Sequence, residues 1–247
     1  MDGAHRLAAL VLAGGLGTRL RPLTDDTPKC LLPVGEDVLL GRWLSALEQA
    51  GVDEVVVNTH HLADVVRPFL LRASSKGRMC VAESHEPDLL GSAGTLSANR
   101  SLADGKEAVV VLYADNVSDV DLRQMLSRHK EQILPVSMLL FHAVDPNACG
   151  IAVVDEVGRV VAFEEKPKHP TSDLANAGVY VFDADAYREA ADLGGKDIGF
   201  DVLPNFVGRM YGIVHNGYHV DVGTPEALAL VRLDAARGRI NPPGGAR

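Results

Sequence analysis

The sequence predicts an α/β fold, with a Rossmann-like, mostly parallel mixed sheet and helices on both of its faces. Short apolar runs rich in valine and leucine alternate along the chain with segments of helical periodicity. The first of these runs are apolar at consecutive positions, which is typical of strands that are covered on both sides. This rhythm favours parallel strands joined by helical crossovers, and ligands of such sheets bind beyond the carboxyl ends of the strands.

The expected elements of the first half follow in chain order. The strands are 7–12, 55–57, 79–82, 108–112 and 136–141, and the helices are 40–47, 62–71, 96–102 and 122–129. Leu40, Trp43 and Leu47 recur at helical spacing as a core stripe. Gly51 stands where a helix C-cap belongs.

The second half of the chain changes character. Its turns separate three short apolar or alternating runs, which are 151–154, 160–163 and 178–182. These runs predict an antiparallel section, and a helix over 225–237 is expected to close the fold. No internal repeat or low-complexity linker divides the chain, so we expect one domain over residues 1–240 and a disordered tail over 241–247.

Composition excludes several classes of partner. The 247-residue chain has a formal net charge of −9, which argues against nucleic acid and anionic membranes, because both require a basic face. Its three cysteines are an odd number and far apart, which favours free thiols in a reducing compartment. The apolar run 7–13 lacks the strongly basic leader of a signal peptide and continues into glycines. We therefore expect a cytoplasmic protein that does not enter a membrane.

A glycine-rich loop follows the first expected strand, with the sequence Leu12-Ala13-Gly14-Gly15-Leu16-Gly17-Thr18-Arg19-Leu20. Glycines let backbone N–H groups approach phosphate oxygens, and such nests of amides bind anions. Arg19 and Lys29 add positive charge. The spacing fits neither the G-x-G-x-x-G dinucleotide fingerprint nor the G-K-[ST] of a Walker loop. A plain tight turn is the alternative interpretation.

Six segments, in the same order along the chain, resemble motifs of the sugar-1-phosphate nucleotidyltransferases, also called nucleoside-diphosphate-sugar pyrophosphorylases. They are LAGGLGTRLRPLTDDTPK from Leu12, LGSAGTL from Leu90, Asp115-Asn116, Glu164-Glu165-Lys166-Pro167, Asn176-Ala177-Gly178-Val179-Tyr180 and Asp221-Val222-Gly223-Thr224-Pro225-Glu226. The resemblance covers roughly residues 7–230 and departs at Ala114, where the family usually has glycine. It implies a nucleotide-diphospho-sugar transferase type of fold in a short, single-domain member, most similar to mannose- or heptose-1-phosphate guanylyltransferases.

The resemblance also implies a magnesium-dependent reaction, in which a nucleoside triphosphate and a sugar 1-phosphate give a nucleoside diphosphate sugar and pyrophosphate. Asp115 and Asp221 would hold Mg²⁺, which prefers carboxylate and phosphate oxygens. Arg19, Lys29 and Lys166 would be the catalytic cations. The implied nucleotide-binding residues are Leu12, Ala13, Gly14, Gly15, Gly17, Thr18, Glu83, Gly91, Ser92 and Ala93, and the implied sugar-phosphate-binding residues are Asn116, Gly150, Glu165, Lys166 and Asn176.

The predicted identity of the nucleotide base depends on Glu83, which stands where members of the family contact the edge of the base. A carboxylate only accepts hydrogen bonds, and guanine offers two adjacent donors, so Glu83 favours GTP. The alternative is a uridylyl- or thymidylyltransferase acting on glucose 1-phosphate or an amino-sugar 1-phosphate. A catalytically silent, nucleotide-binding regulatory subunit is a remote alternative, because Arg19, Lys29 and Asp115 are all present. Whether the protein forms a homo-oligomer stays open.

Other polar residues are interpreted as structural. Adjacent residues on a helix or strand end point apart, so His60 and His61 are not expected to share a metal ion. Asp119 and Asp121 are expected to cap the helix that follows them.

Overall fold

The computed structural model describes residues 7–240, and the chain divides into two compact units. Among the described residues, unit 1 consists of 7–89, 113–123 and 217–240, and unit 2 consists of 90–112 and 124–216. Each unit combines stretches that are distant in the sequence, so neither is a continuous piece of chain. The organisation as one domain over residues 1–240 stays a prediction, and the expected tail over 241–247 lies outside the described residues.

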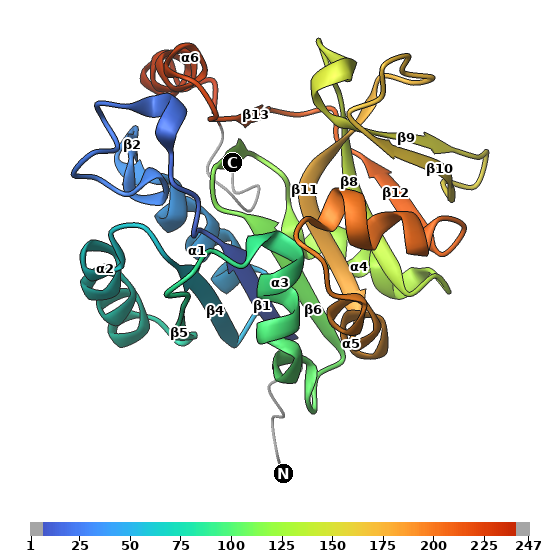
Figure 1. The fold of residues 1–247 in the computed structure, drawn as a ribbon, viewed down its shortest axis with the longest axis horizontal. Helices are drawn as coiled ribbons and strands as arrows, with labels where there is room; N and C mark the ends of the chain where they lie inside the picture. The colour runs from blue at the N-terminus through green and yellow to red at the C-terminus, as the bar shows by residue number, and fades with distance from the viewer. Residues whose placement is uncertain (1–6, 241–247) are drawn as a thin grey trace. The chain divides into compact units, whose positions relative to one another are not determined.

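The sheet of unit 1 contains three parallel strands, β1 (Leu7–Leu12), β4 (Glu54–Thr59) and β5 (Cys80–His85). They lie side by side in Figure 1, where α1 (Leu39–Gln49) precedes β4 and α2 (Ala63–Lys76) joins β4 to β5. Trp43 is buried on α1, as the core stripe predicts, and Gly51 takes the left-handed conformation just after the helix, with a φ of 79°.

A two-stranded antiparallel ribbon completes unit 1. It pairs β7 (Asn116–Ser118) with β13 (His219–Asp221), and α6 (Pro225–Ala236) follows it. Thr224 begins α6, because its hydroxyl accepts the N–H of Ala227 at 3.2 Å. The ribbon shares an apolar core with α6 and with the small hairpin of β2 (Pro33–Val34) and β3 (Asp37–Val38). The buried members of this core are Leu20, Leu32, Val34, Leu39, Val117, Val222, Leu228 and Val231.

Unit 2 is built around the long strand β11 (Leu174–Asp183). This strand pairs antiparallel with β6 (Ala108–Tyr113), β8 (Val136–His142) and β9 (Gly150–Val154). The hairpin partner of β9 is β10 (Val160–Glu165), and β12 (Met210–Val214) lies parallel to β8. The predicted antiparallel section and the α/β class with mixed strand directions are therefore confirmed.

Three α-helices accompany these strands, namely α3 (Gly91–Ala98), α4 (Leu122–Glu131) and α5 (Ala184–Leu193). An aromatic cluster holds α5 against β11: the ring of Phe182 lies 6.4 Å from that of Tyr187 and 5.9 Å from that of Phe206, edge to face in both cases. Such pairs add stability beyond the burial of their surface.

Some elements differ from those that the sequence predicts. Helix α3 begins at Gly91, earlier than the expected range 96–102, and a 3-10 turn (Arg100–Ala103) follows it. Helix α5 and strand β12 were not predicted. Helix α5 is amphipathic, with Tyr187 and four alanines on its buried side, but this pattern was not assigned to a helix; the short β12 is interrupted by Gly212.

The polar residues interpreted as structural have hydrogen-bond partners within unit 1. Asp121 accepts the N–H of Arg123 at 2.9 Å and so caps α4, whereas Asp119 accepts the N–H of Tyr218 at 2.8 Å. The rings of His60 and His61 bond to different main-chain carbonyls, at 2.9 and 3.3 Å. They are therefore directed to separate partners, as expected.

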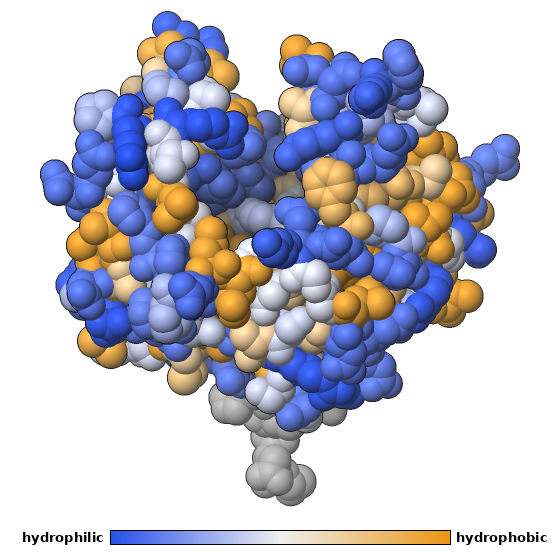
Figure 2. Space-filling model, viewed as in Figure 1, coloured by the Kyte–Doolittle hydropathy of each residue, from blue (hydrophilic) through white to orange (hydrophobic). Residues whose placement is uncertain are grey.

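The surface mixes hydrophilic and hydrophobic residues on the face that Figure 2 presents. Among residues 7–240, no helix combines the length and the apolar character needed to cross a membrane.

The buried His129 gives the fold a dependence on pH. Its Nδ1 lies 2.9 Å from the hydroxyl of Ser137 and its Nε2 lies 3.1 Å from a carboxylate oxygen of Asp183. Burial lowers the pKa of His129 below its ordinary value, although Asp183 acts in the opposite direction. The unfolded chain therefore takes up more protons as the pH falls through about 6.5, and the free energy of unfolding decreases there.

We predict that this acid-induced loss is smaller in the variant His129→Gln. Urea denaturation at about pH 7 and about pH 5 would measure the free energy of unfolding of both proteins. The exposed His169 supplies the control, because His169→Gln should keep the pH dependence of the wild type. An equal loss in His129→Gln and wild type would contradict the prediction.

Candidate functional site

Two aspartates of unit 1 are brought together by the ribbon of β7 and β13. Asp221 ends β13 and pairs with Asn116, the residue after Asp115. The N–H of Val222 donates to the main-chain carbonyl of Asp115 at 2.9 Å, and the indole of Trp43 donates to that of Asn116 at 2.8 Å. Backbone hydrogen bonds and a buried tryptophan thus hold both aspartates at the same end of the ribbon.

Two short 3-10 helices, η1 (Thr18–Leu20) and η2 (Lys29–Leu31), carry cations to these aspartates. The Nζ atom of Lys29 lies 2.6 Å from Oδ2 of Asp115, and the lysine side chain is only 11% exposed. A Cβ atom at Gly223 would lie 2.9 Å from Nη2 of Arg19 and 3.3 Å from Oδ2 of Asp221. The missing side chain at this glycine makes room for both charged groups.

The surroundings of Asp221 change the pKa of its carboxyl group. Burial raises the pKa of Asp221, and the negative charge of Asp115 raises it further. Lys29 and Arg19 act in the opposite direction without restoring the ordinary value. A cation bound by these carboxylates would favour their charged forms.

The two carboxylates fit a magnesium ion. Mg²⁺ is commonly bound by one or two protein carboxylates, with water and substrate phosphates as its other ligands. Within residues 7–240, no group of three or more histidine, cysteine, aspartate or glutamate side chains gathers as a closed metal site would. Asp115 and Asp221 would be the protein ligands of such an ion, with phosphates and water as the others.

Two N–H groups at the start of the glycine loop donate to a side chain, in contrast to the anion-binding nest that the sequence predicts. The N–H groups of Ala13 and Gly14 both donate to Oδ1 of Asn58, at 2.6 and 3.1 Å. The Nδ2 of Asn58 donates in turn to Glu86 at 3.0 Å. These amides are already engaged, so a phosphate would be left with the later amides of the loop, from Gly15 onward. Asn58 was missed, although a polar residue in the valine-rich segment of β4 is a signal for such a role.

The glycine loop nevertheless lies beside the charged residues. A small cavity of about 20 Å³ is lined by Ala13, Gly15, Lys29, Cys30, Ala114 and Asp115. Gly17, further along the loop, has a left-handed φ of 63° and offers its carbonyl to the hydroxyl of Thr24. Burial raises the pKa of Cys30 to about 12, which keeps its thiol neutral and unreactive as a nucleophile.

Glu83, the predicted reader of the base, already has partners within unit 1. Its Oε2 accepts a hydrogen bond from Nε of Arg67 at 2.6 Å, and its Oε1 accepts one from the hydroxyl of Thr59 at 2.6 Å. Burial raises the pKa of Glu83, but these bonds and the arginine charge outweigh it, so the pKa lies below the ordinary value. A base that donates to the Glu83 carboxylate would therefore compete with Arg67 and Thr59 for its oxygen atoms.

Unit 2 carries a second group of predicted residues at the end of β10. Glu165 pairs with Gly150 across the β9–β10 hairpin, and a Cβ atom at Gly150 would collide with the Glu165 carboxylate. Burial raises the pKa of Glu165, and the charge of Asp197 raises it further, with Lys166 opposing. Asp197 was not among the predicted site residues, because nothing in its local sequence marks it.

The other sugar-phosphate-binding residues predicted in unit 2 differ in whether they already have hydrogen-bond partners. Lys166 has a left-handed φ of 51°, and its N–H donates to the main-chain carbonyl of Cys149. Its side chain is 60% exposed, and its ammonium lies 4.0 Å from the carboxylate of Glu165. Asn176 donates to the hydroxyl of Tyr180 at 2.7 Å and accepts the N–H of Gly178. Lys166 is free to reach a ligand, whereas Asn176 is committed within β11. In unit 1, the predicted sugar-binding Asn116 is buried in the ribbon.

The predicted nucleotide-binding residues at the start of α3 are also engaged within unit 2. The hydroxyl of Ser92 accepts the N–H of Ile198 at 2.9 Å, and the N–H of Ala93 donates to the carbonyl of Lys196 at 3.2 Å. Gly91 has a φ of 79°, and a Cβ atom there would collide with the same carbonyl. These three residues bind the chain at 196–198.

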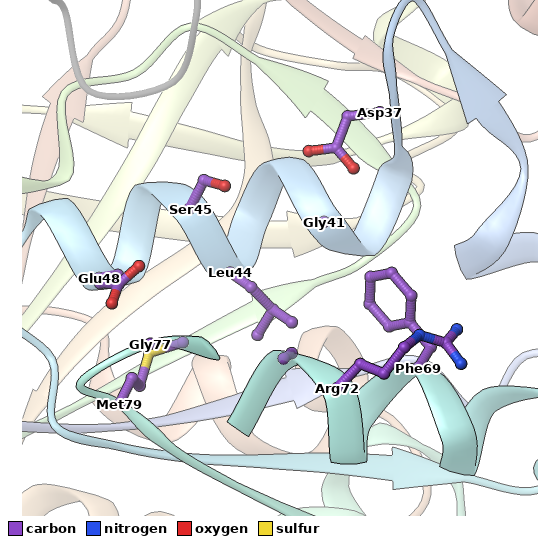
Figure 3. A pocket seen from close by; sticks show the side chains of 10 residues that line it. Asp37, Gly41, Leu44, Ser45, Glu48, Phe69, Arg72, Gly77 and Met79 are labelled. Atoms are coloured by element: carbon purple, nitrogen blue, oxygen red, sulfur yellow. The ribbon is translucent and has the colours of Figure 1, made fainter. Parts of the chain in front are cut away.

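A larger cavity, of about 310 Å³, lies between α1 and α2. Figure 3 shows Leu44 of α1 directed towards α2, with Phe69 and Arg72 on the facing helix. None of the predicted site residues lines this cavity, so it is separate from the candidate site.

The sequence matches the family model described as nucleotidyl transferase over residues 8–237. The chain therefore belongs to the nucleotidyl transferase family. Within unit 1, this membership accords with two aspartates and two cations that gather next to a glycine loop.

Similar proteins bear more specific names. The chain is 34% identical over 240 residues to a mannose-1-phosphate guanylyltransferase of Mycobacterium tuberculosis and 34% identical over 224 residues to mannose-1-phosphate guanylyltransferase 1 of Arabidopsis thaliana. These matches cover 95% and 89% of the chain but only 66% and 62% of the relatives. A crystal structure assigned as a glucose-1-phosphate thymidylyltransferase of Bacillus anthracis, in complex with sucrose, has a TM-score of 0.80 and 25% identity, with 93% and 95% coverage.

We predict that Asn58→Ala destabilises the protein by about 2–4 kcal/mol, because buried amide groups of the glycine loop lose their acceptor. Urea denaturation would measure this loss in the free energy of unfolding. Asn205→Ala is the control, since Asn205 also bonds to main-chain groups but lies on the surface, and it should lose less than about 1 kcal/mol. Equal losses in the two variants would show that Asn58 does not hold the loop.

Proposed function

We propose that this protein transfers a nucleoside monophosphate from a nucleoside triphosphate, with GTP favoured, to a sugar 1-phosphate of the mannose or heptose type. The observation that carries the proposal is the pair Asp115 and Asp221 with Lys29 and Arg19 beside them. Family membership and the similarity to mannose-1-phosphate guanylyltransferases support it. The three free cysteines support the cytoplasm as the place of action.

The reaction needs positioning and charge neutralisation. A phosphate oxygen of the sugar phosphate attacks the α-phosphorus, a new P–O bond forms, and the bond to the β-phosphate breaks to release pyrophosphate. Arg19 and Lys29 would hold the triphosphate and stabilise the charge that develops on it. When bound to Asp115 and Asp221, Mg²⁺ supplies further neutralisation of the phosphates.

The residues of unit 2 would hold the other substrate. The exposed ammonium of Lys166 can pair with the phosphate of the sugar. Glu165 is half-buried near the charge of Asp197, and its oxygen atoms can accept hydrogen bonds from sugar hydroxyls. No covalent nucleophile is required, in agreement with the neutral thiol of Cys30.

A uridylyl- or thymidylyltransferase is the second candidate. It is favoured by the hydrogen bonds that Arg67 and Thr59 already make to Glu83, because these reduce the advantage of guanine. The likeness to the Bacillus anthracis structure points in the same direction.

The test is pyrophosphate release with Mg²⁺, each nucleoside triphosphate in turn and a panel of sugar 1-phosphates. Selective release with GTP and mannose or heptose 1-phosphate would support the first proposal. Release with UTP or dTTP alone would refute the guanine preference and favour the second candidate. No release with any pair would refute the transferase and leave a silent, nucleotide-binding subunit.

We predict that Asp115→Asn and Asp221→Asn each lower turnover at least about a hundredfold, or about 2.7 kcal/mol, because each removes a carboxylate ligand of the metal. Steady-state kinetics would measure turnover, and circular dichroism would verify folding. Asp185→Asn is the matched control, since the Asp185 side chain is 95% exposed and pairs with Arg188 on the surface of unit 2. Near-normal turnover in both site variants would refute the metal assignment.

A further inference from the structure

The chain at 196–201, referred to here as the 196–201 segment, is tied to the start of α3. Its first contact is the hydrogen bond from the N–H of Ala93 to the carbonyl of Lys196 at 3.2 Å. Its second is the hydrogen bond from the N–H of Ile198 to the hydroxyl of Ser92 at 2.9 Å. Gly91 packs against the Lys196 carbonyl so closely that a side chain at this position would collide with it. The position of the 196–201 segment is therefore coupled to the position of the first residues of α3.

The 196–201 segment is internally braced by two aspartates. The Oδ2 atom of Asp201 accepts the N–H groups of Lys196 and Asp197 at 2.7 and 2.9 Å. The Oδ1 atom of Asp197 accepts the N–H groups of Gly199 and Phe200 at 2.8 and 3.1 Å. Because four hydrogen bonds brace these six residues, a displacement of Ile198 would also displace Gly199.

Gly199 is the point where the segment meets Glu165. A Cβ atom at Gly199 would collide with Oε2 of Glu165 and would lie 3.1 Å from Oδ1 of Asp197. A Cβ atom at Gly150 would also collide with Oε2 of Glu165, so both glycines restrict where this carboxylate can lie. Within residues 7–240, no hydrogen bond to the Glu165 carboxylate is present, so packing against these glycines sets its orientation.

We propose that Ser92 is a positioning residue for Glu165 and acts through the 196–201 segment. The hydroxyl of Ser92 fixes Ile198, the braced turn fixes Gly199, and Gly199 confines the carboxylate that receives the sugar hydroxyls. This inference rests on the proposed function. It assigns Ser92 to the sugar phosphate, whereas its motif resembles a nucleotide-binding loop.

The first experiment separates the two substrates. Ser92→Ala removes one hydrogen bond and should raise the KM for the sugar 1-phosphate about three- to tenfold, as the loss of such a bond would. The KM for the nucleoside triphosphate should stay within about twofold. Calorimetric titration with the sugar 1-phosphate alone should show the same weakening, and Ser92→Thr, which keeps the hydroxyl, should restore it.

Ser97→Ala is the matched control. Ser97 lies on the same helix, and its hydroxyl donates to the carbonyl of Ala191 at 2.5 Å, so it ties α3 to the end of α5 and not to the 196–201 segment. This variant should leave the KM of both substrates unchanged. Thermal unfolding of both serine variants would show whether a general loosening of α3 explains any effect.

The second experiment is a double-mutant cycle with Glu165→Gln. If Ser92 acts through Glu165, adding Ser92→Ala to Glu165→Gln should change the affinity for the sugar 1-phosphate less than about twofold. A full additive effect in the cycle, or a KM change confined to the nucleotide, would overturn the inference. Absence of pyrophosphate release from the wild type would instead refute the proposed function.

Discussion

The structure of unit 1 depends on keeping two carboxylates together at the end of one ribbon. Partial burial raises the pKa of Asp221, and the negative charge of Asp115 raises it further. The ribbon hydrogen bonds and the apolar core beneath them hold the two carboxylates together. Lys29 and Arg19 then offset the charge, which explains why the turns that carry these cations are fixed against the ribbon.

Both units use glycines to make room for charged groups. In unit 1, Gly223 leaves space for a guanidinium and a carboxylate, and in unit 2, Gly150 and Gly199 confine the carboxylate of Glu165. Any side chain at these positions would push a charged group away from its place. Packing against Gly150 and Gly199 thus orients Glu165 and leaves its oxygen atoms available to a ligand, whereas ribbon hydrogen bonds hold Asp221 in place.

The sequence predicts those parts of the fold whose signals are local. The buried strands β1 and β6 are continuous apolar runs, and Thr224 begins α6 with an N-cap that can be recognised in the sequence. Helix α5 was not predicted, although its buried tyrosine and alanines recur at helical spacing, so its local signal was present in the sequence. The approach of Asp115 to Asp221 is a tertiary contact between distant segments, so only the resemblance suggested it. Asp197 escaped because its effect on Glu165 arises from packing between η5 (Ile198–Val202) and β10.

The two glycine-containing loops that resemble nucleotide-binding motifs use several of their polar groups internally. Asn58 holds the first amides of one loop, and the 196–198 chain holds Ser92 and Ala93 of the other. Fewer amides than the motifs suggest are therefore left for phosphates in this conformation. In the proposed reaction, the triphosphate would then be held chiefly by the positive charges of Arg19 and Lys29. Charge would select the triphosphate, while the internal bonds keep both loops in shape.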